Sequence, residues 1–428
     1  MRHSIYLHIP FCTHRCAYCD FNTYAGQESA IPAYVAALCR EVEYVGEEAP
    51  RNVTIHTVFF GGGTPSLLSP QQVWAVLDTI RSAFRVEDDA EVTLETNPGT
   101  VSVAALRSLL GAGVNRISLG VQSANGEELH MLERVHSFRD VLDAVSALRR
   151  AGFVSLNTDL IYGVPEQTME TWQTTVRRVL GFHPEHISAY ALTLEQGTPF
   201  GQWARRGLLP PLDPDLAADM YEWLEEELRL QGYAQYEISN WAQDGRECRH
   251  NLQYWRGGPY LGFGAGAHGY TYGYRYSNVL AIKSYIERLS EGGPDPREEG
   301  RGSEPGESEF APSPQYPCSP AAISQHRQSS EEDMSEFMIM GLRLTREGIS
   351  AEEFQRRFGQ GLFETYGPRL TKLTQLGLLE WADCKAFGTE SRVQDARGKA
   401  DKIVRLTRRG RLLGNRVFSE FVGLSATV

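Results

Sequence analysis

Three of the seven cysteines lie together near the amino terminus, in the segment Cys12-Thr-His-Arg-Cys16-Ala-Tyr-Cys19. This C-x3-C-x2-C spacing offers three thiolates, which can bind three irons of a [4Fe-4S] cluster and leave the fourth iron open to a small molecule. In a reducing cytosol, such a group of cysteines indicates a metal or redox site. The other cysteines are scattered and do not suggest a disulfide framework: Cys39, Cys248, Cys318 and Cys384.

A structural zinc site is the main alternative for the three clustered cysteines. Zinc requires four closed ligands, usually supplied as paired Cys or Cys/His groups. The nearest fourth ligands would be His8 and His14, and the position two residues after Cys19 is Phe21 rather than a fourth cysteine. The spacing and the motifs that follow favour the iron–sulfur cluster.

A glycine-rich turn, residues 61–65 (GGGTP), directly follows an apolar run that ends at Phe60. Glycines at a strand end let the backbone approach a ligand closely and expose its N–H and C=O groups. Such a turn is a weak signal on its own. Its place one β/α unit after the cysteines makes Gly62, Gly63 and Thr64 candidate binding residues.

Polar side chains lie within or soon after the next three β-rich runs: Glu95, Gln122, Arg134 and Asp159. Ligands of parallel α/β folds collect at the carboxyl ends of the strands. Carboxylates can accept hydrogen bonds from hydroxyl and amino groups, and arginine can pair with a carboxylate. Each residue alone would be an ordinary polar strand end, but their common placement predicts a shared binding site.

The elements that must position these residues alternate regularly through the first half of the chain. Strands are expected at residues 5–9, 57–60, 91–95, 115–121, 155–161 and 186–192, and helices near residues 31–47, 70–84, 101–111, 137–151, 168–181 and 214–231. Six successive β/α units imply a parallel sheet with right-handed crossovers, and eight would be needed to close a barrel. The predicted fold class is therefore α/β, a partial (β/α)6 TIM-like barrel over residues 1–232.

A composition change marks residues 291–333, which hold ten acidic and three basic residues, seven prolines, seven serines and five glycines. Such a segment cannot bury enough apolar surface to offset its ordering entropy, so we predict a disordered insertion. Helical patterns at residues 333–342, from 350 and at 368–376, then strand-like runs at 378–381 and 403–406, predict a winged-helix-like α+β domain over residues 334–428. Residues 397–416 hold eight basic residues and one acidic residue, which indicates a solvated wing rather than a phosphate-binding surface.

Net charge and hydropathy limit the classes of partner and the cellular compartment that the sequence is compatible with. The net charge of −12 argues against a nucleic-acid partner. No apolar run is long enough to cross a bilayer, and the first residues lack the layout of a secretory signal. We expect a cytoplasmic protein with at most peripheral membrane association, although an organelle protein after removal of its transit peptide would look the same. A homodimer is compatible with the sequence but has no clear signature in it.

A histidine and two aromatics stand close together in His250-Asn251-Leu-Gln-Tyr254-Trp255, within an expected extension over residues 233–290. A neutral imidazole is a common axial heme ligand, and neighbouring aromatic rings can pack against a porphyrin face. Cys248 could compete as a ligand, and His268 follows a nearby glycine turn as a weaker candidate. From residue types alone, packing roles for His250 and Trp255 are favoured.

The segment Tyr6-Leu-His-Ile-Pro-Phe-Cys12, followed by Cys16-Ala-Tyr-Cys19, resembles the start of radical S-adenosylmethionine (SAM) proteins related to oxygen-independent coproporphyrinogen III oxidase. The resemblance covers nearly the whole chain apart from the insertion. It implies that SAM binds the open iron, where one electron cleaves it to methionine and a 5′-deoxyadenosyl radical. It also implies a SAM site lined by Tyr6, Tyr18, Gly62, Gly63, Thr64, Glu95, Gln122, Arg134 and Asp159.

Two features bear on the branch of that family. The oxidases carry a further cysteine two residues past the third cluster cysteine, where this chain has Phe21. The H-N-x-x-Y-W pattern resembles heme chaperones of the HemW type, which implies heme held by His250, Asn251, Tyr254 and Trp255 and delivered to heme proteins such as respiratory enzymes. The alternatives are a coproporphyrinogen III oxidase that forms protoporphyrinogen IX and a radical SAM enzyme that acts on RNA or protein.

Overall fold

The computed structural model describes residues 1–290, 319–383 and 402–422, and the chain divides into two compact units. The first unit consists of residues 1–224 and 259–327, and the second of residues 225–258 and 328–428. The boundary after residue 224 falls inside α8 (Pro214–Leu230). The extension expected over residues 233–290 is thus divided: residues 233–258 belong to the second unit and residues 259–290 to the first.

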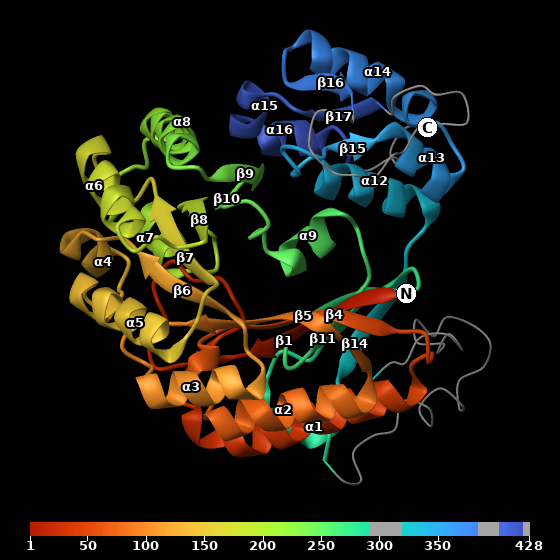
Figure 1. The fold of residues 1–428 in the computed structure, drawn as a ribbon. Helices are drawn as coiled ribbons and strands as arrows, with labels where there is room; N and C mark the ends of the chain where they lie inside the picture. Colours follow the sequence, from red (N-terminus) through yellow and green to blue (C-terminus); the bar gives the residue numbers. More distant parts are fainter. Residues whose placement is uncertain (291–318, 384–401, 423–428) are drawn as a thin grey trace. The chain divides into compact units, whose positions relative to one another are not determined.

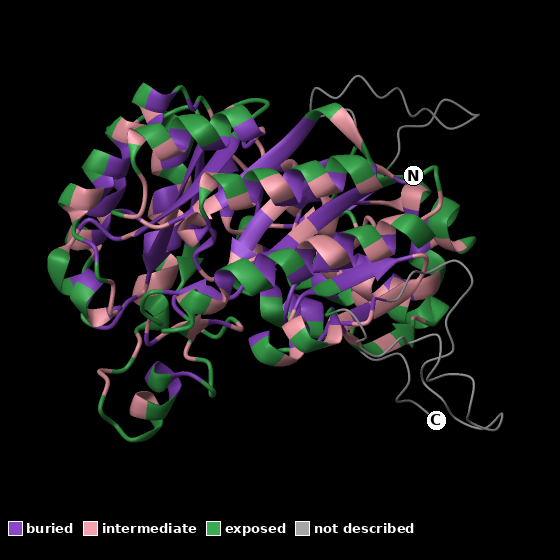
Figure 2. Ribbon diagram, turned by 90° about the horizontal axis from the view of Figure 1, so that it is seen from below, coloured by how far each residue is buried: buried purple, intermediate pink, exposed green. Residues whose placement is uncertain are grey.

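The first unit is built on the six parallel strands that the sequence predicts: β1 (Arg2–Ile9), β4 (Thr54–Gly62), β5 (Arg85–Thr96), β6 (Arg116–Gln122), β7 (Leu156–Tyr162) and β8 (His186–Ala191). They neighbour one another in this order, each in parallel with the next. Their near-continuous burial is typical of parallel strands covered on both faces (Figure 2). The predicted α/β class and partial barrel are confirmed.

Four further strands extend this sheet beyond β1: β11 (Tyr260–Phe263), β12 (His268–Thr271), β13 (Tyr274–Asn278) and β14 (Ala322–Arg327). The strand β11 pairs in parallel with β1, and the other three continue as antiparallel neighbours. A short parallel pair, β2 (Phe11–Cys12) with β3 (Tyr24–Ala25), brackets the cysteine segment. The sequence did not predict these additions.

Helices of the first unit connect the strands and bury one apolar face each: α1 (Ile31–Glu48), α2 (Pro70–Ala83), α3 (Val103–Ala112), α4 (Gly126–Met131), α5 (Phe138–Ala151), α6 (Met169–Leu180), α7 (Pro199–Arg205) and α10 (Ile282–Arg288). Figure 1 shows α1, α2 and α3 side by side along one face of the sheet. Capping boxes at Ser69, Ser137 and Thr168 fix the starts of α2, α5 and α6.

The second unit contains a hairpin of β9 (Ala234–Glu237) and β10 (Asn240–Ala242), then α9 (Arg249–Trp255). Its remaining elements are α12 (Ser330–Gly341), β15 (Ile349–Ser350), α13 (Ala351–Phe358), α14 (Leu362–Gln375), β16 (Leu379–Asp383), β17 (Lys402–Leu406), α15 (Arg408–Leu412) and α16 (Gly414–Ser419). The sheet order β15-β17-β16 with three helices is a winged-helix arrangement. Its core is formed by residues such as Phe354, Leu370 and Val404.

Two local predictions were wrong. The third helix of this domain begins at Leu362 rather than residue 368, and Pro368 lies inside it, because Leu362, Tyr366 and Leu370 all bury in the core. The disordered insertion predicted over residues 291–333 was wrong at its carboxyl end, since residues 322–327 form β14 and α12 begins at residue 330. An edge strand held by backbone pairing needs little apolar content, so composition did not reveal it. Residues 291–318, with Cys318, and Cys384 lie outside the described residues.

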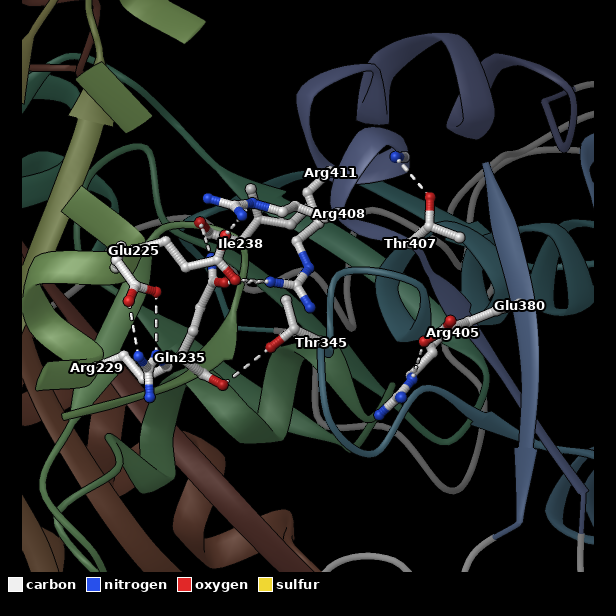
Figure 3. A network of polar contacts seen from close by, with 12 residues as sticks. Glu225, Arg229, Gln235, Ile238, Thr345, Glu380, Arg405, Thr407, Arg408 and Arg411 are labelled. Atoms are coloured by element: carbon white, nitrogen blue, oxygen red, sulfur yellow. Dashed lines mark hydrogen bonds and ion pairs between the residues drawn. The ribbon is translucent and has the colours of Figure 1, made fainter. Parts of the chain in front are cut away.

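Figure 3 shows that several arginines of the basic stretch at residues 397–416 are used within the second unit. Arg411 donates to the carboxylate of Glu225 at 2.6 Å and to Gln235 Oε1 at 2.7 Å, and Arg405 pairs with Glu380 at 2.8 Å. The side chains of Arg405 and Arg411 are only 19% and 16% exposed. For these two residues the expected solvated wing was wrong, because each guanidinium is largely buried in an ion pair.

Candidate functional site

A cavity of about 370 Å³ opens at the carboxyl ends of the parallel strands of the first unit. The segment that follows β1 brings Cys12, Cys16 and Cys19 to its wall. A turn closed by Cys19 N and Cys16 O at 3.1 Å shapes this segment, and the buried Ala17 anchors it by accepting a hydrogen bond from Phe200 N. The three thiols therefore face one shared space.

The glycine turn at the end of β4 is packed directly against the cysteine segment. A Cβ atom on Gly63 would lie 2.6 Å from Phe11 O and 3.1 Å from Cys12 Sγ, so only glycine fits without displacement of the backbone. Gly62 has φ of 107°, a left-handed value that also favours glycine. The next residue, Thr64, donates its backbone N–H to Phe11 O at 2.8 Å and its hydroxyl to Cys12 Sγ at 3.5 Å.

A buried arginine ties the cysteine segment to two strand ends. Arg134 donates to Asn97 Oδ1 at 2.6 Å and to Gly120 O at 3.1 Å, and its other terminal nitrogen lies 3.6 Å from Cys16 Sγ. Asn97 in turn donates to Thr64 Oγ1 at 2.9 Å. This chain of contacts fixes the ends of β4, β5 and β6 relative to the thiols, so the site is preorganised.

Two half-buried carboxyl groups, Glu95 and Asp159, line the same cavity. Burial, and then the charge of Asp159, raise the pKa of Glu95 to about 8, although Gly62 N donates to its carboxylate at 3.0 Å. Burial also raises the pKa of Asp159, which accepts from Ser118 Oγ and Asn157 Nδ2, each at 2.8 Å. Two neighbouring carboxyl groups with raised pKa values favour a cationic ligand, because added positive charge stabilises their ionised forms.

The cavity brings together the three cysteines and every predicted SAM residue except Tyr6. Tyr6 lies beside the site, where its hydroxyl and His8 Nδ1 are 3.0 Å apart and its ring stacks on Phe59. Gln122 lines the cavity with φ of 63°, an uncommon backbone value at the end of β6. Sequence reasoning missed Asn97, although it follows Glu95 by two residues at the same strand end.

The thiol donors can be tested against the two metal centres considered for them. Within the described ranges, no three His, Cys, Asp or Glu side chains form a group that could hold a metal ion. A structural zinc ion takes four ligands on one centre, whereas a cubane cluster takes each of three thiolates on a different iron. Three thiols around a shared cavity, next to a glycine turn, fit the cluster better.

The predicted heme residues lie in the second unit, on the short helix α9. His250 is buried, and its Nε2 lies 2.9 Å from Tyr254 Oη, with the two rings edge to face. Cys248, the residue before the helix, is fully buried and its backbone N–H donates to Tyr236 Oη. His268 lies in the first unit, on β12.

The last residue of α9 has a cationic neighbour from the C-terminal segment. The Arg343 guanidinium lies 4.3 Å from the centre of the Trp255 ring, and Arg343 also pairs with the buried Glu237 at 3.5 Å. A desolvated cation over an indole face is a favourable contact. Trp255 therefore has a packing role in this structure, as the residue types alone had suggested, while Asn251 is half-buried.

A parallel β/α sheet with a three-cysteine segment after its first strand and a glycine turn after its second defines a radical SAM protein. The model of the Radical SAM superfamily matches residues 6–179, and the model of the HemN C-terminal domain matches residues 328–383. The solved structure of coproporphyrinogen III oxidase (HemN) from Escherichia coli, a radical SAM enzyme, shares the fold with a TM-score of 0.74 at 22% identity, over 98% of this chain and 89% of that one.

Curated relatives show which family of radical SAM proteins this chain resembles. The heme chaperone HemW of Bacillus subtilis is 35% identical over 424 residues, which cover 98% of this chain and 99% of that protein. The heme chaperone HemW of Escherichia coli is 41% identical over 268 residues, 62% of this chain and 69% of that protein. The chain belongs to the HemW family of radical SAM proteins, a family that implies SAM and a [4Fe-4S] cluster. None of the helices in the described part of the chain combines the length and apolarity needed to cross a bilayer.

Proposed function

We propose that this protein is a heme chaperone, which binds heme and passes it to heme proteins such as respiratory enzymes, and which carries a SAM-bound [4Fe-4S] cluster. The observation that carries the proposal is family membership: the identity to the HemW protein of Bacillus subtilis extends over 98% of this chain. Phe21, at the wall of the cysteine cavity where the oxidases place a further cysteine, supports the same choice.

In this proposal Cys12, Cys16 and Cys19 would hold the cluster, which would bind SAM and, after reduction by an external donor, supply the electron for its cleavage. The chain itself contributes a fixed frame. Gly63 allows the glycine turn to touch the cysteine segment, and Arg134 holds Cys16 against the ends of β5 and β6. Glu95 and Asp159 are the carboxyl groups whose ionised forms a positively charged group of SAM would stabilise.

Heme is assigned to α9, with His250 as the iron ligand and Asn251, Tyr254 and Trp255 beside it. In the structure His250 Nε2 and the Tyr254 hydroxyl lie at hydrogen-bond distance. Coordination through that nitrogen would therefore require Tyr254 to turn away. The contact makes Tyr254 a residue that competes with heme for the imidazole.

The test is anaerobic. The cluster is reconstituted in the full-length protein, SAM and a reductant are added, and coproporphyrinogen III decarboxylation is assayed while heme is titrated in parallel. Heme binding without decarboxylation is the expected result. The protein should also give up its heme to an apo heme protein, measured by the change in the Soret band of the acceptor.

Multiple-turnover formation of protoporphyrinogen IX would contradict the proposal and favour the alternative, an oxygen-independent coproporphyrinogen III oxidase. The observation that keeps this alternative open is the assembled cavity, in which the cysteines and all but one of the predicted SAM residues meet. A chaperone needs heme binding and release, whereas the oxidase needs SAM cleavage coupled to loss of carboxyl groups. The two assays separate these requirements.

A further inference from the structure

A second cavity, of about 230 Å³, lies in the first unit on the strands added beyond β1. Its wall comes from β12, β13 and β14, and it is lined by His268, Arg275, Tyr276, Ser277, Ile323, Ser324, Gln325 and His326. None of the described residues that line it is acidic. In a chain with a net charge of −12, an arginine and two histidines with no acidic residue among the described lining residues favour an anionic ligand.

Strand register explains how this group forms. His268 is paired with Ser277 and Ser277 with Ser324, while Arg275 is paired with His326. Side chains of directly paired residues lie on the same face of a sheet. The imidazoles, the guanidinium and the serine hydroxyls therefore share one face across three neighbouring strands.

The guanidinium of Arg275 is held in place by two aromatic residues. It lies 5.0 Å from the centre of the Tyr270 ring, and its Nη1 donates to Tyr260 Oη at 3.2 Å. Stacking on a ring leaves the edge of a guanidinium as its hydrogen-bonding side, and that edge matches the geometry of a carboxylate.

The size of the cavity limits what enters it. At about 230 Å³ it is smaller than the roughly 300–1,000 Å³ of pockets that enclose drug-sized ligands. It therefore suits an acidic side arm better than a whole macrocycle. Its donors, a fixed guanidinium with hydroxyl and imidazole groups, are those that bind a carboxylate.

We propose that this cavity binds a propionate carboxylate of the porphyrin that the protein carries, with Arg275 as the principal partner and His268, His326 and Ser324 beside it. The proposal rests on the proposed function and deepens it, because it assigns the acidic edge of the ligand and leaves the iron ligand to a separate test. The cavity lies on the sheet whose strand β1 leads into the cysteine segment, and β11 of this sheet pairs in parallel with β1.

The experiment compares heme with heme dimethyl ester, in which both propionates are uncharged, on the full-length protein with its cluster reconstituted. Dissociation constants are measured by absorbance titration for the natural chain and for Arg275→Gln. The natural chain should bind heme about tenfold or more tightly than the ester, and Arg275→Gln should remove most of that preference while changing ester affinity little. Arg139→Gln serves as the matched control, since the Arg139 side chain is 79% exposed and forms an ion pair with Asp143 on its own helix.

The same preference in Arg275→Gln as in the natural chain would overturn the proposal. If Arg275→Gln does not fold, His326→Gln is measured in the same way, since His326 is exposed; a severalfold loss of the preference supports the proposal and an unchanged preference contradicts it. Failure of the natural chain to bind either compound would instead refute the proposed heme function, and this proposal with it. Binding of both compounds with equal affinity keeps the chaperone function and rejects the propionate site alone.

Discussion

The cysteine cavity of the first unit and the helix α9 of the second unit differ in how their polar groups are used. Around the cavity, thiols, carboxyl groups and strand-end amides face a common space. On α9 the corresponding groups contact protein partners: His250 meets Tyr254, and Trp255 meets Arg343. Both segments carry residue types suited to a cofactor, but the cysteine segment lines a cavity, whereas His250 and Trp255 are in contact with other side chains.

The difference shows what a short motif does and does not establish. Residue types state which chemistry is available, but the surrounding structure decides whether a side chain can use it without breaking an existing contact. A buried imidazole with a nearby phenol must exchange that contact for a new ligand. We therefore expect cluster and SAM binding to depend on groups already in place, and heme binding at α9 to require rearrangement.

The largest expected effect comes from the thiols. Replacing Cys16 with Ala leaves two thiolates for the cluster, so we expect essentially complete loss of bound iron and sulfide after anaerobic reconstitution, measured by iron and acid-labile sulfide analysis and by absorbance near 400 nm, roughly where such clusters absorb. Cys39→Ala is the matched control, because Cys39 is a half-buried cysteine on α1 outside the cavity. Full iron and sulfide content in Cys16→Ala would show that cluster assembly does not require the Cys16 thiol.

A smaller effect should come from the raised pKa of Glu95, which is about 8 because of burial and the nearby Asp159. At pH 7 this carboxyl group is mostly protonated, and a cationic ligand favours its ionised form. SAM affinity should therefore rise with pH, by about tenfold between pH 7 and pH 9 if SAM binds only the ionised form.

The measurement is equilibrium dialysis of labelled SAM against the reconstituted protein. Because the α-amino group of SAM titrates in the same range, with a typical pKa near roughly 8, the informative quantity is the ratio of affinities between the natural chain and Glu95→Gln at each pH. A ratio that does not change with pH would mean that Glu95 does not ionise when SAM binds. The cavity would then be less well matched to a cation than its two carboxyl groups suggest.

Much of the cavity could be predicted from the sequence because its signals are local. The cysteine spacing, the glycines after β4 and the polar residue near the end of β5 all follow from strand ends meeting at one edge of a parallel sheet. Asn97 was missed because its importance comes from joining Thr64 to Arg134, two residues from different loops. No spacing rule along the chain reveals such a three-way contact.

The second unit was less predictable because the contacts that define it join residues that are far apart in the sequence. The ring of Trp255 at the end of α9 contacts Arg343, which in turn pairs with Glu237. Arg343 is distant from Trp255 in sequence, and no sequence pattern marks Glu237 as its partner. The edge strand β14 was hidden because its pairing with β13 uses backbone groups, which composition does not report. Local patterns predicted the helices and strands of the winged domain, while the contacts between its two chain segments had to come from the structure.

The smallest expected effect tests whether α9 must open to bind heme. Tyr254→Phe removes the hydroxyl that contacts His250 Nε2 and leaves the ring, so a ligand to that nitrogen would no longer compete with it. Since a typical net hydrogen bond contributes about 1 kcal/mol, heme affinity should rise by roughly fivefold in Tyr254→Phe and fall in His250→Ala. Heme titrations followed at the Soret band provide the measurement.

If Tyr254→Phe weakens heme binding as much as His250→Ala does, the phenol helps to hold heme rather than compete with it, and the contrast between a preassembled cavity and a closed helix no longer holds. If neither change alters the heme spectrum or affinity, heme is held away from α9.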